Sequence, residues 1–179
     1  SWPSGTCGRP VPGLMARVCG ICPVSHALAS SKAGDRILGV DVPVAAVKQR
    51  RLASYAQILQ SHALSFFHLS SPDLMLGLDA DPKLRNLFAM TERDEAFVRR
   101  GIRLRKFGQR VVELVGGRRV HPGWSVAGGV TTAFPREAAA ELAPWFPELY
   151  ESVTLALRWL EQFFPKLQVE IDTMGDFPS

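Results

Sequence analysis

The chain has 179 residues, of which 46% are hydrophobic and 21% are charged, and its formal net charge is +4 at pH 7. These values are ordinary for a globular protein and exclude collagen-like, coiled-coil and largely disordered chains. Because no apolar run approaches the roughly 18 residues that a bilayer-spanning helix needs, we expect no membrane span. The small excess of basic residues is a weak signal, so we also expect no nucleic-acid partner.

The N-terminal part of the chain is rich in glycine and proline. We therefore expect residues 1–18 to form an extended lead-in without regular structure. After it, an alanine-rich segment predicts a helix over residues 23–37, and Pro23 suits its first turn because the missing N–H is not needed there. This arrangement places Cys22 at the N-terminus of a helix.

Longer helices follow. The apolar spacing predicts a helix over residues 43–70, which Ser71-Pro72-Asp73 breaks or restarts. Another helix is predicted over residues 92–115, ending at Gly116-Gly117, where glycine supplies a left-handed cap. A glycine-rich connection and a last helical region over residues 135–164, interrupted by Pro144 and Pro147, complete the pattern.

These elements predict a mainly α fold in a single partial domain. Its parts are the lead-in (1–18), a segment with the first metal-ligand motif and the core helices (19–134), and a C-terminal helical region (135–179). On the helix over residues 92–115, four basic residues recur at spacings of three and four, namely Arg99, Arg103, Lys106 and Arg110. We favour a solvated face for this basic stripe, with a docking face for a partner subunit or an RNA-binding surface as alternatives.

Residues 17–26 carry the sharpest chemical signal and read Arg-Val-Cys-Gly-Ile-Cys-Pro-Val-Ser-His. Cys19 and Cys22 can present both sulfurs to one centre, and a helix N-terminus favours the thiolate. His26 lies about one helical turn after Cys22 and can reach back as a ligand or a hydrogen-bond partner. A structural zinc site would need two more ligands, and the chain offers no second cysteine pair, only Cys7 and scattered histidines. A thioredoxin-like pair would need an apolar strand before the motif, so both of these interpretations fit poorly.

The motif resembles the N-terminal signature R-x-C-G-x-C-x-x-x-H of the large subunit of nickel–iron hydrogenases, with every fixed position present. The resemblance continues through residues 31–36, 60–69 and 117–124, and it looks most like the cytoplasmic, heteromultimeric, NAD-reducing branch. It implies the helical-bundle core of that subunit, here incomplete. It also implies reversible oxidation of dihydrogen at a nickel–iron centre whose iron carries cyanide and carbon monoxide, a centre that soft thiolates suit.

The resemblance also implies roles for single residues. Cys19 matches the terminal nickel thiolate, which is a possible proton acceptor, and Cys22 matches a thiolate that bridges nickel and iron. His26 matches the histidine that hydrogen-bonds near the bridging sulfur, and Arg17 matches the signature arginine. Asp73 matches an aspartate placed over the metals, although helix capping alone would also explain an aspartate after Ser-Pro.

The remaining candidate ligands have simpler interpretations. We expect His62, His68 and His121 to be packed or hydrogen-bonded structural residues. Cys7 has no partner in the sequence and counts as a small apolar residue or a free thiol.

The family's second cysteine pair comes from an Asp-Pro-Cys-x-x-Cys-x-x-His motif late in a longer chain, and these 179 residues do not contain it. We therefore expect the isolated chain to be inactive. The resemblance implies an iron–sulfur small subunit, docked against the face with the first cysteine pair, and diaphorase subunits that carry flavin and NAD. Three cysteines, two of them in one motif, favour the cytoplasm over a disulfide-forming compartment.

Two alternatives to the enzyme stay open. One is a truncated, non-catalytic homologue that acts as a scaffold. The other is a small metal-binding or thiol-redox domain that uses Cys19, Cys22 and His26 alone.

Overall fold

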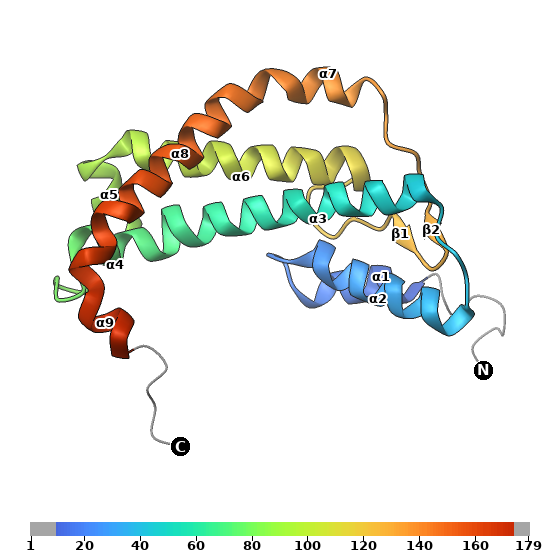
Figure 1. Ribbon diagram of the computed structural model, residues 1–179, viewed down its shortest axis with the longest axis horizontal. Coiled ribbons are helices and arrows are strands. Elements are labelled where there is room, and N and C mark those ends of the chain that lie inside the picture. The colour runs from blue at the N-terminus through green and yellow to red at the C-terminus, as the bar shows by residue number, and fades with distance from the viewer. Residues whose placement is uncertain (1–9, 174–179) are drawn as a thin grey trace.

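A computed structural model describes residues 10–173, which form helices and one short hairpin (Figure 1). The mainly α fold predicted from the sequence is confirmed. The helices are, in chain order, α1 (Pro10–Met15), η1 (Ala16–Val18), α2 (Pro23–Leu38), α3 (Val44–Leu64), η2 (Ser65–Ser70), α4 (Ser71–Leu76), α5 (Leu87–Arg93), α6 (Glu95–Gly116), α7 (Ala138–Leu142), η3 (Ala143–Trp145), α8 (Phe146–Phe163), η4 (Phe164–Leu167) and α9 (Gln168–Thr173). The strands β1 (Ser125–Val126) and β2 (Gly129–Val130) pair antiparallel, with Ser125 opposite Val130.

The N-terminal part of the described chain is helical, so the expectation that residues 1–18 lack regular structure is wrong from Pro10 onward. α1 and η1 pack against α2, and the side chains of Pro12 and Ala16 are buried there. Short helices depend on tertiary packing more than on propensity, which explains why composition alone missed them. Residues 1–9, with Cys7, lie outside the described residues.

α3 and α6 run side by side through the middle of the molecule (Figure 1). Two glycines of α6 let the helices approach closely. A Cβ added at Gly108 would lie 2.7 Å from the main-chain oxygen of Ala56, and one added at Gly101 would lie 2.3 Å from Cβ of Phe67. Because only glycine has no Cβ, both positions need it for this packing.

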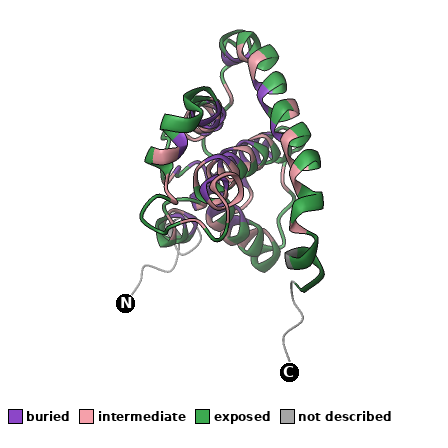
Figure 2. Cartoon of the chain, turned by 90° about the vertical axis from the view of Figure 1, so that its left-hand side faces the viewer, coloured by how far each residue is buried: buried purple, intermediate pink, exposed green. Residues whose placement is uncertain are grey.

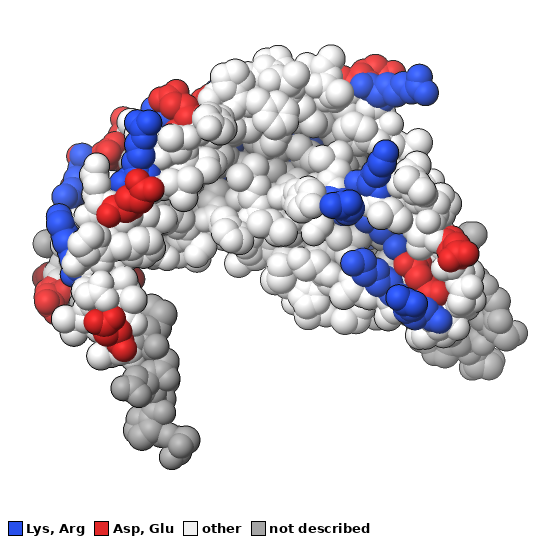
Figure 3. All heavy atoms as spheres, in the orientation of Figure 1, with Lys and Arg blue, Asp and Glu red and all other residues white. Residues whose placement is uncertain are grey.

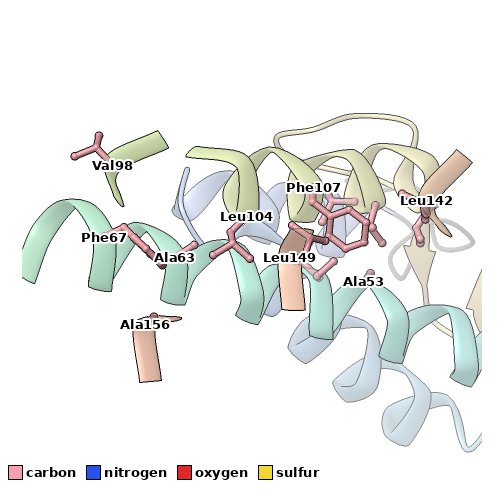
Figure 4. Close-up of a cluster of buried hydrophobic side chains, with 14 of the residues drawn as sticks. Ala53, Ala63, Phe67, Val98, Leu104, Phe107, Leu142, Leu149 and Ala156 are labelled. Atoms are coloured by element: carbon pink, nitrogen blue, oxygen red, sulfur yellow. The ribbon is translucent and has the colours of Figure 1, made fainter. Parts of the chain in front are cut away.

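The apolar core lies between α3, α6 and α8. Figure 4 shows Leu104 and Phe107 of α6 beside Ala63 and Ala53 of α3, and Leu149 and Ala156 of α8 also belong to this buried cluster. Figure 2 shows the buried residues on the inner sides of the helices, while the outer face of α8 is exposed. Burial of this apolar surface is the main term that holds the helices together.

The long helix predicted over residues 43–70 is confirmed, with a difference at its end. α3 runs into the π-helical turn η2, and a new helix, α4, begins at Ser71, as the Ser-Pro-Asp sequence predicted. The hydroxyl of Ser71 donates to the Phe67 oxygen at 2.6 Å across this junction. A π-helical turn often marks a functional region of a helix.

α5 was not predicted, because only its capping residue distinguishes it from a loop. The side chain of Asn86 accepts hydrogen bonds from the N–H groups of Phe88 and Ala89. Asp94 then separates α5 from α6 and caps α6 by accepting from the Phe97 N–H, so that α6 begins at Glu95 rather than at residue 92. The predicted end of α6 is confirmed, since Gly117 adopts a left-handed φ of 75°.

The basic stripe of α6 is mostly exposed, as the sequence favoured, since Arg99, Arg103 and Lys106 are exposed and Arg110 is half-buried. Three of its residues also contact α7, η3 or α8 of the same chain. Arg103 pairs with Glu148, Arg110 pairs with Glu141, and the Lys106 ammonium lies 6.0 Å from the centre of the Trp145 ring. Arg99 pairs within α6, with Glu95. The predicted C-terminal helical region is confirmed, and the stripe attaches it to α6.

A buried ion pair joins α2, α3 and the hairpin. Arg50 of α3 donates to Asp35 of α2 at 2.6 and 3.3 Å, and also to the oxygens of Val126 and Gly129 at 2.6 and 3.0 Å. Burial of Asp35 opposes its ionisation, but the hydrogen bonds from Arg50 and from the Gly128 N–H, with the charge of Arg50, lower its pKa below the usual value. This network fixes α2, at whose N-terminus the cysteine motif lies.

Among the described residues, no helix is long and apolar enough to cross a membrane. Figure 3 shows the molecule as an arch whose charged side chains gather on its two limbs and leave the middle of this face mostly uncharged.

Candidate metal centre

Residues 19–22, the cysteine loop, connect η1 to α2. Cys19 is extended, with φ −138° and ψ 130°, and Cys22 is the N-cap residue of α2. The Cys22 oxygen accepts from the N–H groups of Ser25 and His26 at 3.1 and 3.4 Å, while Pro23 occupies a position where no N–H is needed. The predicted position of Cys22 at a helix N-terminus is confirmed.

The structure brings three of the predicted site residues together. The ligand atoms of Cys19, Cys22 and His26 all lie within 4.8 Å of one another, and the three residues are half-buried. Both cysteines are free thiols, and the Cys22 N–H donates to Cys19 Sγ at 3.3 Å. Two sulfurs and an imidazole form a donor set that suits soft or borderline transition metals. It fits the half of a nickel–iron centre that the resemblance assigns to these residues.

The two thiols of this cluster differ in acidity. The hydrogen bond from the Cys22 thiol, followed by the N–H groups of Cys22 and Ile21, lowers the pKa of Cys19. That same hydrogen bond, then burial, then the charge of Cys19 raise the pKa of Cys22. Cys19 therefore ionises first, and without a cation the pair holds one negative charge before it holds two.

Two residues that tie the cysteine loop and the preceding η1 to the rest of the fold were not assigned to the site from the sequence. Gln57 Nε2 of α3 donates to the Ile21 oxygen at 2.6 Å. His121 Nδ1, from the glycine-rich connection, donates to the Ala16 oxygen at 2.7 Å, which confirms its structural role. The sequence did hold one indication of a role for Gln57, because it is a polar residue beside Ala53 and Ala56 on the face of α3 that packs inward.

Asp73 is not part of this cluster, and Arg17 lies two positions before Cys19 in the chain. Arg17 is exposed at the end of η1 and lines a cavity of about 660 Å³ together with His121. Asp73 lies in the first turn of α4, where Nε of Arg85 reaches its carboxylate at 3.1 Å. The functional roles of Arg17 and Asp73 stay predictions.

The other two histidines make structural contacts, as expected. His62 Nδ1 donates to the Ile58 oxygen at 2.9 Å within α3. His68 packs against Gly101, and its burial, with a contribution from the charge of Arg105, lowers its pKa.

Sequence comparison finds a match to the nickel-dependent hydrogenase family over residues 5–95. One component of the F420-non-reducing hydrogenase vhu from Methanocaldococcus jannaschii is 37% identical over 171 residues, which cover 94% of this chain and 41% of that protein. The NAD-reducing hydrogenase HoxS subunit beta from Cupriavidus necator is 35% identical, over 94% of this chain and 37% of its own length.

Solved structures agree with these relatives. An NAD+-reducing [NiFe]-hydrogenase in the H2-reduced state superposes with a TM-score of 0.87 at 41% identity, over 93% of this chain and 37% of that one. The Ni-Fe-Se hydrogenase from D. vulgaris Hildenborough superposes with a TM-score of 0.62 at 31% identity, over 87% and 33%. The chain thus spans about two fifths or less of the length of these proteins.

Proposed function

The chain belongs to the nickel-dependent hydrogenase family, and we propose that it forms the part of a large subunit that supplies the first two thiolates of a nickel–iron centre. In the intact protein this centre catalyses the reversible oxidation of dihydrogen to two protons and two electrons. The observation that carries the proposal is the clustering of Cys19, Cys22 and His26 within 4.8 Å at the N-terminus of α2.

In this proposal Cys19 and Cys22 hold the metals through their sulfurs. When bound, the nickel–iron centre, with cyanide and carbon monoxide on its iron, supplies the Lewis acidity and the redox change that dihydrogen cleavage needs. Cys19 Sγ accepts the proton, and the N–H of Cys22 stabilises the thiolate beforehand. His26, whose ring nitrogen lies within 4.8 Å of both sulfurs, is proposed to orient Cys22 Sγ. Arg17 and Asp73 are proposed as polar groups around the centre, on the resemblance of the motifs.

We further propose that the electrons reach NAD. Support comes from the NAD+-reducing enzyme with the TM-score of 0.87 and from the HoxS relative. The electrons then leave through an iron–sulfur small subunit to diaphorase subunits that carry flavin and NAD. The free thiols of Cys19 and Cys22 agree with a reducing compartment, for which we propose the cytoplasm.

The catalytic proposal is tested by Cys19→Ser in the complex purified with its natural partners. We expect loss of dihydrogen uptake and of hydrogen–deuterium exchange, because a serine hydroxyl is a poor ligand for a soft metal. Cys7→Ser makes the same chemical change outside the Cys-x-x-Cys motif and should leave both rates unchanged. Wild-type rates in the Cys19→Ser complex would overturn the catalytic role and favour the scaffold.

The acceptor is tested separately with the wild-type complex. We expect dihydrogen-dependent reduction of NAD+ as well as of a viologen dye. Reduction of the dye without reduction of NAD+ would contradict the NAD assignment and leave the hydrogenase assignment intact.

A further inference from the structure

The cysteine loop is fastened to the body of the protein at the peptide between its two sulfur ligands. Gln57 lies near the middle of α3, 36 positions from Ile21 in the sequence, and its Nε2 donates to the Ile21 oxygen at 2.6 Å. Among the described residues, no other hydrogen bond links residues 19–22 to α3, since those from Ser25 and His26 to the Cys22 oxygen belong to the start of α2. The contact therefore ties the loop to the central helix pair.

Apolar packing does little to fix this loop. The side chain of Ile21 is 51% exposed, and a Cβ added at Gly20 would meet no atom within 4 Å. The Cys22 N–H bond to Cys19 Sγ sets the shape of the loop from within but does not anchor it. Its position relative to α3 thus depends strongly on the hydrogen bond from Gln57.

The burial of Gln57 is unfavourable for the stability of the fold. The residue is 2% exposed, it lies beside Ala56, and its Oε1 is buried without a hydrogen-bond partner. A buried polar atom without a partner destabilises a fold, so a leucine would suit simple packing better. The presence of an amide side chain at this position is explained by the hydrogen bond that its Nε2 donates to the Ile21 oxygen.

We propose that Gln57 is a positioning residue for the metal site. By fixing the Ile21 peptide, its Nε2 keeps the sulfurs of Cys19 and Cys22 within reach of one metal ion and of the His26 ring. The inference deepens the proposed function, because it assigns a residue that holds the ligands of that same site. Outer partners that orient ligands typically change metal affinity by about 10- to 100-fold when they are removed.

The test uses the 179-residue chain and a matched pair of variants. Gln57→Leu removes the contact, and Gln49→Leu is the control. Gln49 is also buried on α3 and donates to a distant main-chain oxygen, that of Thr132, at 2.9 Å. Both variants lose one hydrogen bond of the same kind, but only Gln57→Leu loses one to the cysteine loop. Urea unfolding reports how far each variant is destabilised.

Two readouts separate positioning from stability. Cobalt(II), titrated as the probe, should bind Gln57→Leu about tenfold or more weakly, with a weaker thiolate-to-metal absorption band, and bind Gln49→Leu like the wild type. Amide hydrogen exchange at residues 19–22 of the metal-free chain should be faster in Gln57→Leu alone. Where Gln57→Leu does not fold, Gln57→Met, which keeps the length of the side chain and has no donor, gives the same comparison.

Unchanged cobalt(II) affinity and unchanged exchange in a folded Gln57 variant would overturn the proposal. Equal losses in the Gln49→Leu control would overturn it too, because they would show a general effect of stability. Should the Gln57 effects appear while the complex with its natural partners fails to oxidise dihydrogen, the positioning role would stand and the hydrogenase proposal would fall.

Discussion

The buried pair of Arg50 and Asp35 gives the sharpest prediction of stability. Arg50→Met keeps most of the side-chain volume but removes two hydrogen bonds to Asp35 and two to the hairpin oxygens. The side chains are 6% and 12% exposed, so water replaces little of what is lost. Breaking a buried pair by removing one partner costs about 3–5 kcal/mol, a large share of a typical unfolding free energy of about 5–15 kcal/mol.

The assay is urea unfolding followed by circular dichroism at pH 7. Arg99→Met is the matched control, because the pair of Arg99 and Glu95 is exposed, with side chains at 72% and 58%, and should change the free energy of unfolding by less than about 0.5 kcal/mol. An Arg50→Met variant that loses no more than the Arg99→Met control would refute the reasoning.

The same pair predicts a pH dependence. In the wild type the pKa of Asp35 is lowered, so its contribution is complete above the usual aspartate pKa near 3.8 and is lost as the pH falls below it. In Arg50→Met the burial of Asp35 remains without the main partner and raises its pKa, so this variant is most destabilised at neutral pH. The difference in unfolding free energy between the two proteins should therefore shrink as the pH falls from 7 to 4. A constant difference would contradict this explanation.

Two further predictions concern the packing of α6. Gly108→Ala should lower the free energy of unfolding by about 1–3 kcal/mol, because its Cβ would lie 2.7 Å from the Ala56 oxygen. Gly13→Ala in α1, where an added Cβ meets no atom within 4 Å, should be neutral or slightly stabilising. Equal effects of the two variants in urea unfolding would contradict the close approach of α3 and α6. Arg110→Gln removes the ion pair with Glu141 and should lower the urea midpoint at low salt. The midpoint should fall less at 1 M NaCl, because salt screens half-exposed ion pairs. A fall that does not depend on salt would argue for packing instead.

The sequence predicted the elements that have strong local signals. The apolar spacing of α3 and α6, the cap at Gly117 and the restart at Ser71 all depend on residues near in the chain. The cysteine motif also predicted its own cluster, because Cys19, Cys22 and His26 share one loop and one helical turn. Local geometry was sufficient for these features.

Long-range contacts explain what the sequence analysis missed. α1 exists because it packs on α2, and two residues of the basic stripe, Arg103 and Arg110, pair with glutamates that lie more than thirty positions later. The bond from Gln57 to Ile21 spans a similar distance in the chain. None of these contacts has a signal in periodicity or composition, since each depends on how distant helices meet.

The central claim is that Cys19 and Cys22 are ligands of a nickel–iron centre. X-ray absorption at the nickel edge, on the complex purified with its natural partners, tests it most directly. We expect sulfur scatterers around nickel in the wild type and one sulfur fewer, or no nickel, in Cys19→Ser. A wild-type complex without nickel, or an identical nickel spectrum in the Cys19→Ser complex, would contradict the claim.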